Sequence, residues 1–159
     1  PELLPTPVQR KTVYKQIRKF RETKPIFSMD FQNDAEYVGG CIAGGRNYLH
    51  INAAGDVEPC VFIHYSNVNI HDCSLLDALK SPIFMAYHDA QPFNANMLRP
   101  CPMLENPEKL RTMVKRTGAK STDLRSPEPV DHLCDKCEAY AEEWKPTAEE
   151  LWGERKKGR

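Results

Sequence analysis

The chain has 159 residues, 40% of which are hydrophobic, enough for one ordinary domain or for a small domain with appendages. Its 22 basic residues balance 22 acidic ones, so no overall field favours nucleic acid or an anionic membrane as a partner. No apolar run of about 18 residues occurs, so the sequence excludes an ordinary membrane-spanning helix.

The start of the chain and its cysteines bear on its compartment. The sequence begins at Pro1 with neither an initiating Met nor a signal-peptide pattern, which is typical of a piece of a longer protein. Six cysteines without a secretory signal favour metal binding over a disulfide framework. We therefore expect a cytoplasmic protein.

The N-terminal segment predicts one helix and one strand. Thr6 is a suitable N-cap and Pro7 a suitable first residue for a helix over 6–23, whose apolar residues recur at helical spacing. The apolar run 26–31 then predicts a short, mostly buried strand. A helix that leads into a buried strand is half of a βα repeat and forms no sheet by itself.

Residues 37–70 predict a glycine-rich β-hairpin. β-Prone residues at 47–52 and 57–63 flank a turn signal at 53–56, so the second run folds back on the first. A third strand is expected at 68–70. The hairpin would supply the short sheet of the fold.

The rest of the chain predicts helices joined by irregular segments. Helices are expected from 72–74 to Leu79, from Ser81-Pro82 through Tyr87, from Asn106-Pro107 to Gly118, as a single turn after Cys134, and from Thr147 as a last short helix. The segments 91–105 and 119–131 are expected to be irregular. The fold class is therefore α+β, a small hairpin or short sheet with following helices.

Cys41 and Cys60 are the strongest candidates for metal ligands. Eighteen residues separate them, and the return of the hairpin brings both thiols toward the same end. Gly40, Gly44 and Gly45 surround Cys41, and glycine lets the backbone approach an object closely. Backbone N–H groups turned toward cluster sulfurs donate hydrogen bonds that raise the reduction potential. We therefore interpret these three glycines as cofactor-binding.

Cys101, Cys134 and Cys137 are further candidates. Cys101 lies between two prolines, which fix the loop and prevent a local helix, and iron–sulfur ligands often stand beside proline. The C-x-x-C of Cys134 and Cys137 also occurs in zinc sites and redox dithiols, but no thioredoxin-type strand precedes it. Cys73 stands at a helix start, where a half-buried thiol suffices, so we exclude it as a ligand.

Five candidates compete for the four positions of a [4Fe–4S] cluster. Cys41, Cys60 and Cys101 with one member of the C-x-x-C would complete such a site. Cys41 and Cys60 with both members of the C-x-x-C would also complete it. The spacing leaves both sets open.

Other polar residues are weaker candidates. His64 and His132 lie close in sequence to candidate thiols, and His50 faces away from its apolar strand neighbours. For these histidines we expect hydrogen-bonded or exposed side chains. Asp30 and Asn33 follow the predicted strand, where open α/β folds place ligand contacts, but a polar turn is the expectation.

The segment from Cys41 to Cys60 resembles the opening of a SPASM or twitch domain, the C-terminal auxiliary-cluster region of many radical S-adenosylmethionine enzymes. That family pattern is a cysteine, about nine to fifteen residues, a glycine, four residues and a cysteine. Here thirteen residues separate Cys41 from Gly55. The continuation through Asn69-Ile70, a leucine-rich helix and Ser81-Pro82 also resembles that region. The match covers roughly residues 37–137 and is most specific over 41–82.

The resemblance implies an architecture and a function. Residues 1–35 resemble the last helix and strand of the partial (β/α) barrel, 36–145 a cluster-binding domain, and 146–159 a C-terminal helix with a basic tail. One auxiliary [4Fe–4S] cluster would serve electron transfer or the positioning of a peptide or small-molecule substrate. The implied partner is the N-terminal barrel of the parent chain, which holds S-adenosylmethionine.

Two departures from the family pattern matter. The full SPASM pattern has seven cysteines and two clusters, whereas five candidates suit the single cluster of the shorter twitch type. The C-x-x-x-C-x-x-C motif that binds the catalytic cluster is absent from this sequence. The chain is therefore not expected to be catalytic alone, and radical chemistry would belong to a longer parent enzyme.

A zinc-stabilised, Cys-rich binding module without a redox role is the alternative. Four thiolates suit Zn²⁺ as well as iron, but zinc ligands usually come as two C-x-x-C pairs and one is present. A secreted disulfide-bonded domain is disfavoured by the missing signal and the irregular cysteine spacing.

Overall fold

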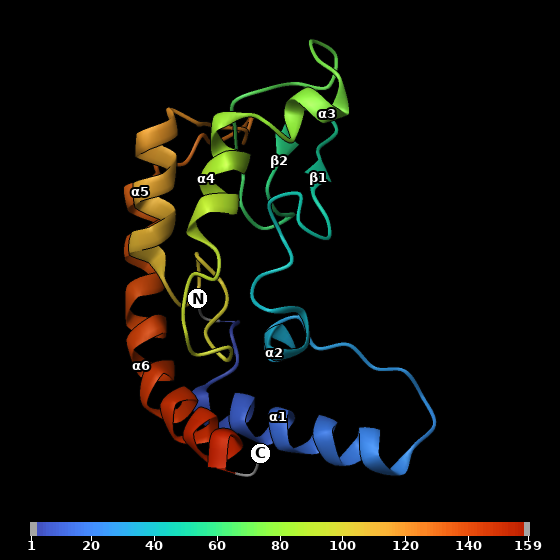
Figure 1. The fold of residues 1–159 in the computed structure, drawn as a ribbon. Helices are drawn as coiled ribbons and strands as arrows, with labels where there is room; N and C mark the ends of the chain where they lie inside the picture. Colours follow the sequence, from blue (N-terminus) through green and yellow to red (C-terminus); the bar gives the residue numbers. More distant parts are fainter. Residues whose placement is uncertain (1–2, 158–159) are drawn as a thin grey trace.

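The computed structural model describes residues 3–157, and this part of the chain forms six helices and four two-residue strands (Figure 1). The helices are α1 (Pro7–Thr23), α2 (Ala35–Val38), α3 (Leu75–Ala78), α4 (Pro82–Ala90), α5 (Pro107–Thr117) and α6 (Val130–Lys157). The strands are β1 (His50–Ile51), β2 (Val57–Glu58), β3 (Tyr65–Ser66) and β4 (Lys120–Ser121). The fold is thus a mixture of helices and small antiparallel sheets, as the α+β prediction states.

The N-terminal helix confirms its prediction. Thr6 caps α1 with a capping box, because its hydroxyl accepts from the Gln9 N–H at 3.3 Å and the Gln9 side chain accepts from the Thr6 N–H at 2.9 Å. Pro7 stands in the first turn, where its missing N–H costs nothing. The helix packs against the C-terminal part of α6 (Figure 1).

The prediction of a strand over 26–31 is wrong. These residues run as an extended coil after α1, and their large apolar side chains are exposed, Phe27 at 89%. A strand needs a neighbour to pair its N–H and C=O groups, and no neighbouring strand is present among the described residues. The run is apolar, but its large side chains stay exposed because no other element within residues 3–157 covers them.

The hairpin forms with a shorter ladder than predicted. β1 and β2 pair antiparallel, with His50 opposite Glu58 and Ile51 opposite Val57. In place of the third strand at 68–70, the structure has a single bridge between Asp56 and Asn69.

A second sheet lies outside the sequence prediction. β3 pairs antiparallel with β4, which falls in the segment predicted to be a polar connector. The strand was missed because β4 is only two residues long and has no alternating apolar pattern.

The C-terminal region is one continuous helix instead of a turn and a separate short helix. α6 runs for 28 residues and continues through Pro146, which lacks an N–H and removes one helical hydrogen bond. Trp144, Ala148 and Leu151 are buried on either side of the proline, so packing offsets the loss. The capping-box signal at Thr147 was therefore overridden by tertiary contacts.

Two hydrophobic clusters hold these elements together. The larger joins the hairpin region, α4, α5 and the start of α6, which run side by side in Figure 1. The smaller joins α1 to the later part of α6 through Tyr14, Leu98 and Trp144. Within residues 3–157, the helices are all too short or too polar to cross a bilayer.

Candidate functional site

Three of the five predicted thiol ligands line one cavity. Cys41 follows α2, Cys60 follows β2, and Cys101 lies in the loop between α4 and α5, so three distant segments converge. The cavity has a volume of about 880 Å³. We call it the thiol cavity, and its lining also includes apolar side chains from 26–31 and 61–62.

The hairpin brings Cys41 and Cys60 to this cavity through close backbone contacts. The Gly44 N–H donates to the Pro59 carbonyl at 2.9 Å, which ties the loop after Cys41 to the residue before Cys60. Gly44 and Gly45 both have positive φ angles, near +71° and +77°. A Cβ at Gly44 would lie 2.6 Å from Tyr87 Cβ, so glycine is needed for the loop to pack on α4.

The three glycines predicted to bind the cofactor have their N–H groups paired within the backbone. The N–H groups of Gly40, Gly44 and Gly45 donate to the backbone carbonyls of Ala35, Pro59 and Tyr48, respectively. These three N–H groups therefore build the loop and do not donate to sulfur in this structure. Gly40 still lines the thiol cavity, whereas the other two glycines pack beneath it.

The hydrogen bonds to sulfur come from other groups, which sequence reasoning missed. The Leu104 N–H donates to Cys101 Sγ at 3.5 Å, and the Ala43 N–H lies near the Cys41 thiol. The Tyr48 hydroxyl lies 2.7 Å from Cys60 Sγ. Each of the three cavity sulfurs thus has a polar hydrogen beside it, which stabilises a thiolate.

The surroundings of Cys41 and Cys101 keep these two thiols neutral when no metal is bound. Burial raises the pKa of the Cys41 thiol to about 11, although the Ala43 N–H opposes the shift. Burial also raises the pKa of the Cys101 thiol well above its usual value, and the nearby Glu105 carboxylate adds to the increase. Coordination of a metal by these thiols would therefore release their protons.

A buried ion pair fixes the Cys101 loop and was not predicted from sequence. Glu105 Oε2 accepts the Cys101 N–H at 2.6 Å, and Arg10 Nη2 lies 2.6 Å from Glu105 Oε1. Arg10 is only 3% exposed, stacks over the Trp144 ring at 4.1 Å and donates to the Leu98 carbonyl. α1 and α6 therefore both support the loop that carries Cys101.

The remaining cysteines lie elsewhere. Among the described residues that line the thiol cavity, neither Cys134 nor Cys137 is present. Both are buried on α6, and Cys134 belongs to the larger hydrophobic cluster. Burial raises the pKa of the Cys134 thiol to about 11, an effect that Arg111 opposes. Cys73 donates to the Asn69 carbonyl at 3.4 Å, as expected for a local structural thiol.

The candidate histidines pair with carboxylates. His50 Nδ1 lies 2.7 Å and His64 Nδ1 3.3 Å from the two oxygens of Glu58, which is fully buried on β2. His132 Nδ1 lies 2.6 Å from Glu128. All three histidines are therefore hydrogen-bonded, as predicted.

The polar residues after the predicted strand form a turn. Asn33 donates to the Asp30 carboxylate at 2.7 Å, and the Asp34 N–H donates to the Asp30 carbonyl at 2.9 Å. This arrangement agrees with the polar-turn expectation.

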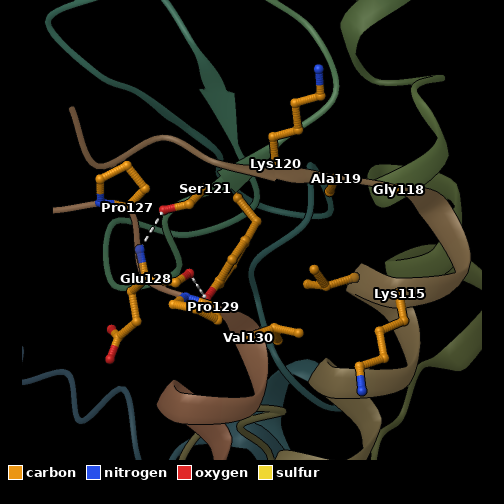
Figure 2. A pocket seen from close by; sticks show the side chains of 11 residues that line it. Lys115, Gly118, Ala119, Lys120, Ser121, Pro127, Glu128, Pro129 and Val130 are labelled. Carbon is orange, nitrogen blue, oxygen red and sulfur yellow. Dashed lines mark hydrogen bonds between the residues drawn. The ribbon is translucent and has the colours of Figure 1, made fainter.

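A second, shallower cavity of about 460 Å³ lies where α5, β4 and the start of α6 meet (Figure 2). Its hydrogen bonds join the connector to itself and to β3: the Glu128 N–H donates to Ser121 Oγ, and the Tyr65 hydroxyl donates to the Glu128 carbonyl. The amino groups of Lys115 and Lys120 point in different directions in Figure 2. They therefore do not converge on a common ligand.

The three thiols of the cavity are the type of ligand that a sulfur-ligated metal group requires. Soft thiolates select iron–sulfur clusters and zinc, and the N–H and O–H neighbours suit thiolate charge. The part of the chain that the structure describes contains no group of three or more His, Cys, Asp or Glu side chains arranged to hold a metal ion. The fit of a cluster therefore rests on the shared cavity and the sulfur environment.

Comparison with known proteins gives no match, because no family model, no curated protein and no solved structure matches this chain.

Proposed function

We propose that the chain is an auxiliary [4Fe–4S] cluster-binding domain of a radical S-adenosylmethionine enzyme. The observation that carries this proposal is the convergence of Cys41, Cys60 and Cys101 on one cavity from three distant segments. Thiols brought together across a fold, without a disulfide between them, are typical of a sulfur-ligated metal group.

The three cavity cysteines would hold the cluster. Three protein thiolates would leave one iron of a [4Fe–4S] cluster open to bind substrate, whereas electron transfer by the cluster needs no open iron. Cys134 or Cys137 as a fourth ligand stays a prediction from the sequence alone.

This chain's own residues would stabilise the bound thiolates. The Ala43 and Leu104 N–H groups and the Tyr48 hydroxyl lie beside the sulfurs and favour their charged form. Such hydrogen bonds also raise the reduction potential of a cluster. Glu105 would keep the Cys101 backbone in place, because its carboxylate accepts that residue's N–H.

The proposed partner is the (β/α) barrel of a parent enzyme. α1 and the segment 24–34 would be the last barrel elements, and the exposed apolar run 26–31 would contact the other strands of that barrel. S-adenosylmethionine and the radical step would belong to that barrel, in a cytoplasmic enzyme. The substrate would be a peptide or a small molecule.

Anaerobic purification of the whole chain tests the proposal. The expected sample is brown, absorbs broadly near roughly 400 nm and holds about four iron and four sulfide per chain. Cys41→Ala, Cys60→Ala and Cys101→Ala should each lose most of this iron, since site formation and folding are coupled.

Cys73→Ala is the matched control, because this thiol is also partly buried but bonds only locally. It should keep its iron. Unchanged iron and sulfide in Cys60→Ala would contradict the proposal. A colourless sample with one zinc would favour the binding module instead.

A further inference from the structure

The walls of the thiol cavity are apolar and carry no unpaired charge. Away from the sulfurs, the cavity is lined by large apolar side chains: Ile26, Phe27, Met29, Phe31, Val61 and Phe62. Among the described lining residues, the charged ones are Arg21 and Asp34. They bind each other through two hydrogen bonds of 2.7 Å, so neither charge is available to a ligand.

One uncharged polar group of the lining lacks a partner. Gln32 lines the cavity, and its side-chain oxygen Oε1 is buried without a hydrogen-bond donor among the described residues. A buried acceptor without a donor is unfavourable, and buried polar atoms normally have partners. Because this oxygen has almost no accessible surface, the Gln32 side chain must turn toward the cavity for a ligand hydroxyl or amide N–H to satisfy it.

We propose that the thiol cavity binds a small, uncharged and mainly apolar molecule with one hydrogen-bond donor, presented as substrate to the cluster. This inference rests on the proposed function, because the cysteines of the cavity are the proposed cluster ligands. A volume of about 880 Å³ lies within the usual range of small-molecule sites. A charged ligand would lose its hydration without gaining a partner in these walls.

A matched series of probes tests the charge preference. The probes are 1-naphthalenemethanol, 1-naphthoate and 1-naphthylmethylammonium, which share one ring and differ in charge. Each is titrated into the whole purified chain, and binding is followed by the naphthalene fluorescence. The neutral alcohol should bind with one-to-one stoichiometry and at least about tenfold more tightly than either ion.

Two single variants locate the site. Phe62 lines the cavity and is 66% exposed, whereas Leu76 lies outside it and is 69% exposed, so both can change without disturbing the core. Phe62→Asp should weaken binding of the alcohol at least about tenfold, and Leu76→Asp should leave it unchanged. Equal binding of the ions, or an equal effect of both variants, would overturn the inference.

Two measurements on the same samples separate the remaining outcomes. Iron and sulfide assays report on the cluster, so absence of probe binding in fully loaded protein overturns this inference alone. Probe binding in protein that never acquires iron supports the ligand class and contradicts the proposed function. Sedimentation velocity identifies self-association, and a dimer that Phe62→Asp dissociates, without probe binding, would show that this face joins two copies.

Discussion

The two groups of candidate cysteines have different surroundings in the folded molecule. Cys41, Cys60 and Cys101 come from three segments that meet only in the folded chain, and all three residues line one cavity. Cys134 and Cys137 belong to one turn of α6 and are buried by packing. In sequence, the C-x-x-C is the more recognisable metal motif. In space, it is the scattered set that shares one cavity.

The difference shows that burial alone does not distinguish a thiol on a cavity wall from a thiol inside the core. Burial raises the pKa of Cys41 and of Cys134 to the same value, about 11. What separates them is access, because Cys41 lies on a cavity wall and Cys134 lies within the larger hydrophobic cluster. The contrast between the two cysteine groups depends first on the residues that hold the Cys101 loop in place.

The largest effect is expected from the ion pair behind Cys101. Arg10→Met would remove the ion-pair partner of the buried Glu105 carboxylate, which costs about 3–5 kcal/mol of unfolding free energy. Urea unfolding followed by circular dichroism measures the loss. The same variant should also bind less iron, since Glu105 holds the Cys101 N–H.

Lys11→Met is the matched control on the same helix. Lys11 pairs with Glu150 at 2.8 Å, but both side chains are partly exposed to solvent. Exposed pairs contribute little, so no measurable change is expected. If Arg10→Met and Lys11→Met lower the free energy of unfolding by similar amounts, the buried pair does not support the cavity.

The sequence predicted local structure well where the signal was local. The Thr6 cap, the proline starts of α4 and α5, and the glycine after α5 all stand where the pattern placed them. The convergence of Cys41 and Cys60 followed from the hairpin turn. These features depend on neighbouring residues, which a sequence reading sees directly.

Features that depend on distant contacts were not predictable. Arg10 and Glu105 are far apart in sequence and form a pair only because α1 and the Cys101 loop pack together. The continuity of α6 through Pro146 likewise depends on the burial of Trp144. A single sequence carries no signal for such pairings, because either residue alone reads as an ordinary surface charge or a helix end.

The second effect is a loss of stability at alkaline pH to which Cys134 contributes. The unfolded thiol ionises near pH 9, while the folded thiol ionises near pH 11, so the folded state binds more protons between these values. Stability should therefore fall as pH rises from about 9 to 11, by on the order of 2 kcal/mol from this group. Cys134→Ala should flatten that slope in urea unfolding series, and an unchanged slope would contradict the assignment.

The third effect separates the two cysteine groups through a polar substitution. Cys134→Ser would place a hydroxyl in the larger cluster and cost about 1–3 kcal/mol, while the iron content stays unchanged. Cys60→Ser should instead lose iron, because its thiol lines the cavity. Iron assays and unfolding on both variants test the contrast. Loss of iron in Cys134→Ser would make that residue a ligand and reverse the comparison.

The smallest effect concerns the hydroxyl beside Cys60. Tyr48→Phe keeps the ring and removes the O–H that lies 2.7 Å from Cys60 Sγ. Iron content should stay unchanged and stability should fall by about 1 kcal/mol. The midpoint potential of the cluster should become more negative, because a hydrogen bond to a thiolate ligand favours the reduced state.

Tyr37→Phe is the matched control, since Tyr37 lines the same cavity but its hydroxyl accepts from Arg18 instead of contacting sulfur. Equal potentials in the two variants would show that the Tyr48 hydroxyl does not act on the cluster.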